Sequence, residues 1–217
     1  LINPVKMDES LVHVVSKLQQ SPIYPQLFYN AFGDSIITGE HTLKAISQFM
    51  LTLISANSKY DSVMRNESVF TAQEYNGYQL FKKNCASCHK EPLFTNDEFM
   101  NNGLALDSSL NDFGRYRVTK NTEDSLKFKV PTLRNIEFSY PYMHDGRMKR
   151  ISEVLDHYSF GIQKSKTLAT ELKQPIVLSP TEKIDLTAFL LTLTDKSFLF
   201  NPKFFYPKEI FQSTAKD

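Results

Sequence analysis

Both cysteines of the chain lie in one short segment, Asn84-Cys85-Ala86-Ser87-Cys88-His89. A disulfide between them would close a loop too small to constrain much of the unfolded chain. A redox dithiol of the thioredoxin type expects a βαβ setting, whereas the flanking sequence here predicts helix. A structural zinc ion needs four ligands and would have to recruit distant histidines. The remaining interpretations are chance spacing and C-x-x-C-H, the pattern of covalent c-type haem attachment.

The haem interpretation is favoured, while zinc and chance spacing stay open. In it, Cys85 and Cys88 form thioethers to the haem vinyl groups and His89 is the proximal iron ligand. The 17 Phe and 10 Tyr residues supply apolar walls for a flat cofactor. Covalent attachment of this kind takes place outside the cytoplasm, so we expect a periplasmic or otherwise exported protein. Residues 1–4 do not have the basic start and apolar stretch of a signal peptide, so the chain is expected to be mature or trimmed.

The distal side of the iron needs a second donor or an open face. A soft methionine ligand raises the reduction potential, and a tyrosine acts differently. The segment Pro141–Gly146 by itself favours Met143. Ordinary core packing is the alternative for each methionine. The downstream candidates are Met100, Met143, His144, Met148, His157 and Tyr158.

Length and charge exclude several classes of protein. The 217 residues correspond to about one and a half typical domains. Lys plus Arg number 25 against 24 Asp plus Glu, and this near-neutrality disfavours a nucleic-acid binder. The apolar stretch 44–54 is too short to span a membrane, so no membrane span is predicted.

The patterns predict an all-α fold, because no alternation long enough for a sheet appears. Residues 55–68 are polar and loop-like and mark the expected domain boundary. Residues 90–150 have little period and predict a long irregular wrap around something large, such as a cofactor. The predicted helices are one capped by Asp8 over 11–18 and ending near Ser21, one from Thr38 to Ile54, one from the Thr71–Glu74 capping box into Cys85, a short one over 151–158, and one from Ser179 through Leu193.

Several segments, in order along the chain, resemble bacterial di-haem cytochrome c peroxidases, and particularly the MauG-like branch. The resemblance covers the C-terminal two-thirds of such proteins. The matching segments are residues 3–7, 31–33, 74–77 with 80–81, 85–89, 114–115, 128–135, 141–146 and 153–158.

The resemblance implies two parts of unequal completeness. Residues 1–68 are expected to be a helical remnant of the N-terminal, peroxidatic domain. Residues 69–217 are expected to be a C-terminal cytochrome c-like domain with the electron-transfer haem. Relatives carry two C-x-x-C-H motifs and this chain has one, so one haem c is expected here and two in the full-length protein. No peroxide-cleaving residue is assigned to this chain, and the fragment alone is expected to be inactive.

The resemblance also changes the choice of distal ligand. Where the peroxidases carry the axial methionine, this chain has Tyr158, as MauG-like proteins do. Met143 then becomes a wall residue, although it stays the alternative ligand. A hard, anionic phenolate should stabilise ferric iron and lower the potential. His144 is expected to support the site or a domain interface, or to be a core histidine. His157 should face another side of its helix.

Further residues are candidates for contacts to the haem propionates or to calcium. Arg115 and Arg134 are candidates for haem propionate contacts, because a guanidinium matches a carboxylate, and surface ion pairs are the alternative. The resemblance implies calcium bound through the backbone carbonyls of Ser139 and Pro141. The remaining histidines, His13 and His41, are expected to be exposed or to serve packing.

Two functions remain in competition. One is the electron-transfer part of a peroxidase or MauG-like oxidoreductase that reduces hydrogen peroxide and meets a redox partner protein. Such relatives often form homodimers. The alternative is a stand-alone monohaem electron carrier without peroxidase activity. A second C-x-x-C-H in the upstream reading frame would decide for the enzyme.

Overall fold

The computed structural model describes residues 8–208 and 210, and the resembling segment at residues 3–7 lies outside this range. Contacts divide the chain into two units. The first comprises the residues up to Ile54 together with those from Phe200 on, and the second is Ser55–Leu199. The predicted assignment of residues 1–68 and 69–217 to two haem domains stays a prediction.

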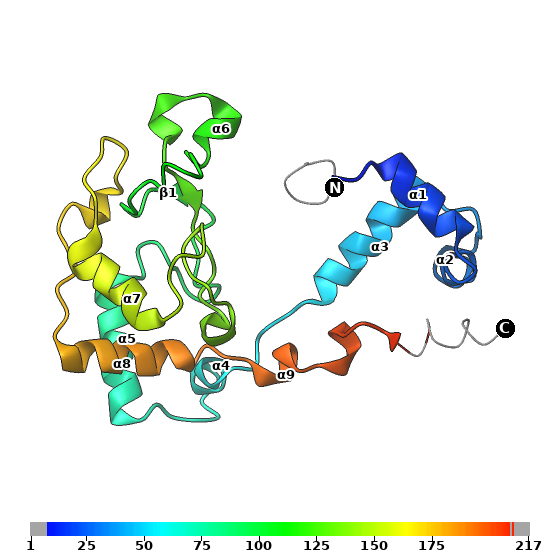
Figure 1. The fold of residues 1–217 in the computed structure, drawn as a ribbon. Coiled ribbons are helices and arrows are strands. Elements are labelled where there is room, and N and C mark those ends of the chain that lie inside the picture. Colours follow the sequence, from blue (N-terminus) through cyan, green and yellow to red (C-terminus); the bar gives the residue numbers. More distant parts are fainter. Residues whose placement is uncertain (1–7, 209, 211–217) are drawn as a thin grey trace. The chain divides into compact units, whose positions relative to one another are not determined.

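The described residues are mainly helical, as predicted (Figure 1). No helix in this part of the chain is long and apolar enough to cross a membrane. The η elements are 3₁₀ helices, except for η3, which is a π-helical turn. In chain order the elements are α1 (Leu11–Gln20), α2 (Tyr24–Phe32), α3 (Gly39–Thr52), α4 (Lys59–Met64), α5 (Ala72–Asn84), β1 (Phe99–Met100), α6 (Tyr116–Thr119), η1 (Thr122–Asp124), β2 (Phe128–Lys129), η2 (Ile136–Phe138), α7 (Ile151–Asp156), η3 (His157–Gly161), η4 (Thr170–Leu172), α8 (Pro180–Leu191), α9 (Lys196–Leu199) and η5 (Pro202–Phe204).

The first unit contains α1, α2 and α3. Thr38 caps α3 as predicted, since its hydroxyl accepts from the His41 amide at 3.1 Å. The predicted cap of α1 is wrong: Ser10, not Asp8, accepts from the amide of His13. Ser10 stands three residues before that amide, which is the separation a capping hydroxyl can bridge. The sequence patterns missed α2, which carries a proline in its first turn, where no backbone N–H is needed.

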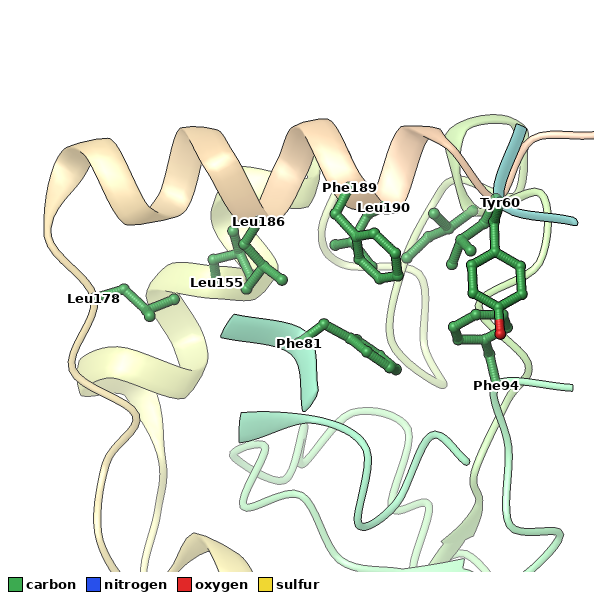
Figure 2. Close-up of a cluster of buried hydrophobic side chains, with 10 residues drawn as sticks. Tyr60, Phe81, Phe94, Leu155, Leu178, Leu186, Phe189 and Leu190 are labelled. Carbon is green, nitrogen blue, oxygen red and sulfur yellow. The ribbon is translucent and has the colours of Figure 1, made fainter. Parts of the chain in front are cut away.

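The second unit is built on a crossing of α5 and α8 that is closed by aromatic rings. Phe81 of α5 and Phe189 of α8 are fully buried, with ring centroids 5.1 Å apart. Figure 2 shows Phe189 reaching from α8 toward Phe81, with Leu155 of α7 beside Leu186. The capping boxes at Thr71 and Ser179 form as predicted and start these two helices. Local capping and a shared apolar face therefore fix both helices of the crossing.

Three local expectations for this unit need correction. The stretch 55–68 is not all loop, because α4 forms behind a capping box of Ser58 and Asp61 and buries Tyr60. A small antiparallel ladder exists where no sheet was predicted, pairing β1 with β2. Strands of two residues are too short to show an alternating pattern. The helix starting at Ile151 continues as the π-helical turn η3 instead of ending as an α-helix.

At Gly77 the backbones of α5 and α8 approach each other closely. A Cβ at this position would lie 2.0 Å from the carbonyl oxygen of Asp185 and 2.8 Å from Cβ of Phe189. The carbonyl belongs to the backbone of α8 and cannot rotate away. The crossing therefore requires glycine here.

We expect Gly77→Ala to lower the free energy of unfolding by roughly 1–3 kcal/mol through overpacking, although the same change in an exposed helix would be stabilising. Urea unfolding of the purified chain followed by circular dichroism measures this. Gln79→Ala, at an exposed position of the same helix, is the control and should change little. Equal stability of Gly77→Ala and wild type would contradict the close crossing.

Candidate haem site

The C-x-x-C-H segment forms a tight turn at the C-terminal end of α5. The amide of Cys85 donates to the Phe81 carbonyl at 2.8 Å and so caps the helix. The carbonyl of Cys85 in turn accepts from the amides of Cys88, at 3.2 Å, and of His89, at 2.9 Å. Both thiols are free. Burial, followed by the nearby Cys88, raises the pKa of Cys85 to about 12. The turn thus gathers two protonated thiols and an imidazole at one helix end.

The imidazole of His89 is held in one orientation. Its Nδ1 lies 3.1 Å from the carbonyl oxygen of Phe94 and 3.1 Å from that of Pro131. Because both partners are acceptors, Nδ1 carries the proton and donates, and the other ring nitrogen, Nε2, is left with its lone pair. Burial lowers the pKa of His89, against the effect of the two carbonyls. A neutral imidazole with a fixed tautomer is what a metal-ligating histidine requires.

The two carbonyls belong to two segments that are joined to each other by hydrogen bonds. Thr95 donates to the Val130 carbonyl at 2.6 Å, and Thr132 donates to the Leu93 carbonyl at 2.5 Å. The amide of Leu133 donates to the Phe94 carbonyl at 3.3 Å. These bonds hold both acceptors of His89 in place from either side.

Arg134 connects the segments around Pro92 and Pro131 to α4. Its guanidinium forms a bidentate pair with Asp61, at 2.9 and 3.0 Å, and also donates to the Pro92 carbonyl at 2.7 and 3.0 Å. The side chains of Arg134 and Asp61 are 11% and 10% exposed, so this is a buried ion pair. The donors of Arg134 are thus engaged within the protein, and its predicted contact to a haem propionate stays a prediction.

Tyr158 lies in the π-helical turn η3 and close to the thiols. Burial raises the pKa of Tyr158 to about 12, with further increases from Cys85 and Cys88, while a hydrogen bond from the Asn102 side chain acts in the opposite direction. A π-helical turn inserts extra residues into a helix and is frequent at functional sites. The turn therefore brings the phenol of Tyr158 to the side of the unit where the C-x-x-C-H segment lies.

Met143, the alternative ligand, contacts the side chain of Asn102. The Met143 sulfur accepts from Nδ2 of Asn102 at 3.4 Å. The backbone of Met143 is left-handed, with φ of 70°. Its loop is closed by the amide of Tyr142, which donates to the Met148 carbonyl at 2.6 Å. Met143 is thus held by Asn102 and by the closure of its own loop.

The histidines near the site have other partners. His157 is buried, and its Nε2 donates to the Asn102 carbonyl at 3.0 Å. His144 stacks on Phe128 with centroids 3.7 Å apart, and burial lowers its pKa. In the first unit, His13 pairs with Glu9 at the surface, as expected of an exposed residue. His41, also in that unit, stacks on the ring of Phe32 at 4.5 Å, as expected of a packing residue.

Three predicted positions remain, namely Arg115, Ser139 and Pro141. Arg115 is exposed, pairs with Asp124 at 3.3 Å and lies 4.4 Å over the ring of Phe99. Ser139 follows η2, and Pro141 comes after a cis peptide bond. Among residues 8–208 and 210, no three His, Cys, Asp or Glu side chains are grouped as a metal ion would need, so the zinc alternative gains no support. The calcium and propionate roles stay predictions.

The donor set of this site fits haem c. Two free thiols and an imidazole with an available Nε2 stand on one turn, and the half-buried Tyr158 lies close to the thiols. Cys85 and Cys88 would hold the haem by thioethers, and His89 would be the proximal ligand.

Comparison with known proteins places the chain in a family. A model of the di-haem cytochrome c peroxidase family matches residues 1–69. The methylamine utilization protein MauG of Methylorubrum extorquens is 38% identical over 196 residues, which is 88% of this chain and 54% of that protein. The cytochrome c peroxidase of Escherichia coli is 37% identical over 153 residues, or 67% of this chain and 33% of that protein. The chain belongs to the di-haem cytochrome c peroxidase and MauG family.

A solved structure agrees with this membership in the di-haem cytochrome c peroxidase and MauG family. The crystal structure of a MauG-like protein associated with microbial copper homeostasis matches with a TM-score of 0.81 and 30% identity, covering 91% of this chain and 65% of that one. The diheme peroxidase BthA of Burkholderia thailandensis, at 20% identity and a TM-score of 0.71, shares the fold. The chain spans about half the length of the MauG proteins that it matches.

The sequence patterns did not single out the partners that orient these ligands. Pro131 lies inside the resembling segment 128–135, but nothing local indicates that its carbonyl binds His89. Asn102 lies in the stretch without a period, and no motif includes it. The signal that was available is the position of Pro131 and Arg134 in one resembling segment.

The buried pair of Asp61 and Arg134 gives a pH-dependent stability. Burial raises the pKa of Asp61, but hydrogen bonds from Arg134 and Ser58 outweigh it, so the folded-state pKa lies below its ordinary value. The contribution is therefore complete above about pH 4 and is lost as the pH falls through the lowered folded-state pKa. We expect Asp61→Asn to lower the free energy of unfolding by about 3 kcal/mol at pH 7 and by less in acid.

Urea unfolding of wild type and variant at several pH values measures this difference. The matched control is Glu67→Gln, which removes an exposed pair with Arg65 and should change little at any pH. A difference between Asp61→Asn and wild type that stays constant down to acid pH would contradict the role of the charge.

Proposed function

We propose that this chain is the electron-transfer haem c part of a di-haem cytochrome c peroxidase or MauG-like oxidoreductase that reduces hydrogen peroxide. The observation that carries the proposal is an imidazole fixed through Nδ1 on a turn with two free thiols, beside a half-buried tyrosine. Membership in the family supports it.

Each residue then has a defined task. Bound haem supplies an iron centre that takes up and gives off single electrons. Cys85 and Cys88 hold it covalently, and His89 presents Nε2 to the iron while two carbonyls keep the ring from turning. Tyr158 is the distal ligand, and as a hard anionic donor it favours ferric iron and a low potential. Met143 is a wall residue.

The proposal includes the molecules that the full-length protein binds and the compartment in which it works. Hydrogen peroxide reacts at a second haem, in the N-terminal domain of the full-length protein. A redox protein is the electron donor or the oxidised substrate, and two copies of the protein form a homodimer. Calcium binds through the carbonyls of Ser139 and Pro141. Covalent haem attachment puts the protein in the periplasm or another exported location.

A stand-alone monohaem electron carrier is the second candidate, and the single C-x-x-C-H in the chain favours it. The deciding experiment is the haem count and peroxidase activity of the full-length gene product. Two haems with hydrogen peroxide turnover support the proposal, and one haem without turnover supports the carrier. A second C-x-x-C-H in the upstream reading frame is an independent check.

We expect one covalent haem on this chain when it is produced with a c-type haem attachment system. A pyridine haemochrome assay and the intact mass measure it together. The variant with both Cys85→Ala and Cys88→Ala should lose covalent haem completely. Ser87→Ala, which changes the exposed residue between them, is the control and should keep it. An apo mass with bound zinc in the wild type would refute the haem site.

We expect Tyr158→Phe to change the optical and electron paramagnetic resonance spectra of the ferric protein and to raise its midpoint potential, because a hard anionic donor is lost. Met143→Leu, which removes the alternative distal ligand, should leave both unchanged. A near-infrared charge-transfer band of Met-ligated iron in the wild type would show that Met143 is the ligand instead.

A further inference from the structure

Each carbonyl that accepts from His89 belongs to the middle residue of a three-residue segment, 93–95 in one case and 130–132 in the other. Thr95, the last residue of the first segment, donates its hydroxyl proton to the carbonyl of the first residue of the second segment at 2.6 Å. Thr132, the last residue of the second segment, donates to the carbonyl of the first residue of the first segment at 2.5 Å. Both segments are thus joined by a hydroxyl before and after the acceptor residues.

The direction of each of these hydroxyls is set by a second hydrogen bond. The backbone amide of Asp97 donates to Oγ1 of Thr95 at 3.1 Å. In the same way, the backbone amide of Arg134 donates to Oγ1 of Thr132 at 3.1 Å. A hydroxyl that accepts from the amide two residues further on has its single proton left for another acceptor. Both threonines therefore accept locally and donate to the opposite segment.

The ring of His89 needs both acceptors at one spacing. Its Nδ1 carries a single hydrogen and lies 3.1 Å from each carbonyl oxygen. A relative displacement of the segments by roughly 0.5 Å would lengthen one of these contacts beyond hydrogen-bond distance. The amide of Leu133 also joins the segments, through the Phe94 carbonyl, but at 3.3 Å. The shorter bonds of Thr95 and Thr132 therefore set the spacing.

We propose that Thr95 and Thr132 are positioning residues that maintain both hydrogen bonds of His89 and thereby keep the reduction potential of the haem low. This rests on the proposed haem site. A hydrogen bond donated by the ring N–H makes a ligating imidazole more basic and fixes its orientation. A more basic ligand favours ferric iron, and hydrogen bonding around the ligands is one of the means by which a protein sets the potential.

The test uses the haem-loaded chain and the variants Thr95→Val, Thr132→Val and the double variant. Valine keeps the branched shape of threonine and has no hydroxyl. We expect the midpoint potential to rise in each single variant and to rise further in the double variant. The electron paramagnetic resonance spectrum of the ferric haem should change with it, because the ring is less firmly oriented. Thr132 is exposed, so Thr132→Val provides the test even if the double variant does not fold.

Two kinds of control separate the hydroxyl from other effects of substitution. Thr95→Ser and Thr132→Ser keep the hydroxyl, and the midpoint potential should return to that of the wild type. Thr119→Val, in α6, removes a threonine hydroxyl that donates to the Arg115 carbonyl at 3.4 Å, and it should leave the potential unchanged.

Two results would overturn the proposal. One is an unchanged potential and spectrum in folded Thr95→Val and Thr132→Val, even if urea unfolding shows that both are less stable, because the threonines would then serve the fold alone. The other is an equal rise of the potential in the serine variants, because the hydroxyl would then not be responsible.

Failure of the underlying site has a different signature. Absence of covalent haem from the wild type would refute the haem site itself. A wild type with one covalent haem, together with valine variants that have the same potential, would leave the site standing and refute only the role of the two threonines.

Discussion

The candidate haem site of the second unit depends on one imidazole ring, that of His89, being held in one orientation. The Nδ1–H of His89 is shared between the carbonyls of Phe94 and Pro131, which come from segments far apart in the sequence. The buried pair of Asp61 and Arg134 holds these segments against α4. Burying an ion pair is costly, and such pairs often add little net stability. Here the pair has a positional use, because it keeps in place the carbonyls that leave Nε2 of His89 available.

The other side of the site is built from irregular backbone. Tyr158 stands in the π-helical turn η3, and Met143 in a closed loop with a left-handed residue. Such conformations persist where the surrounding contacts hold them, and they concentrate at functional sites. Asn102 contacts both pieces: its side-chain amide donates to the Met143 sulfur, and its backbone carbonyl accepts from His157 of η3. Asn102 thus links the loop of Met143 to the turn that carries Tyr158.

The crossing of α5 and α8 sets the position of this site. Gly77 lets the helices approach until aromatic rings fill the space between them, and α5 then ends at Cys85, where the ligand turn begins. A shift of the crossing would move the thiols and the imidazole together. The crossing thus places a cluster of buried apolar side chains next to the ligand turn (Figure 2).

Much of the helical framework could be predicted, because its signals are local. The capping residues Thr38, Thr71 and Ser179 act on amides three residues away, and the C-x-x-C-H spacing is complete within one turn. The short ladder, the π-helical turn and the partners of His89 could not be predicted, since each depends on contacts between distant segments. The sequence by itself determined the chemistry of the ligands and the family. Only the tertiary structure decided their orientation, because an imidazole or an amide gains a direction from hydrogen-bond partners that folding brings to it.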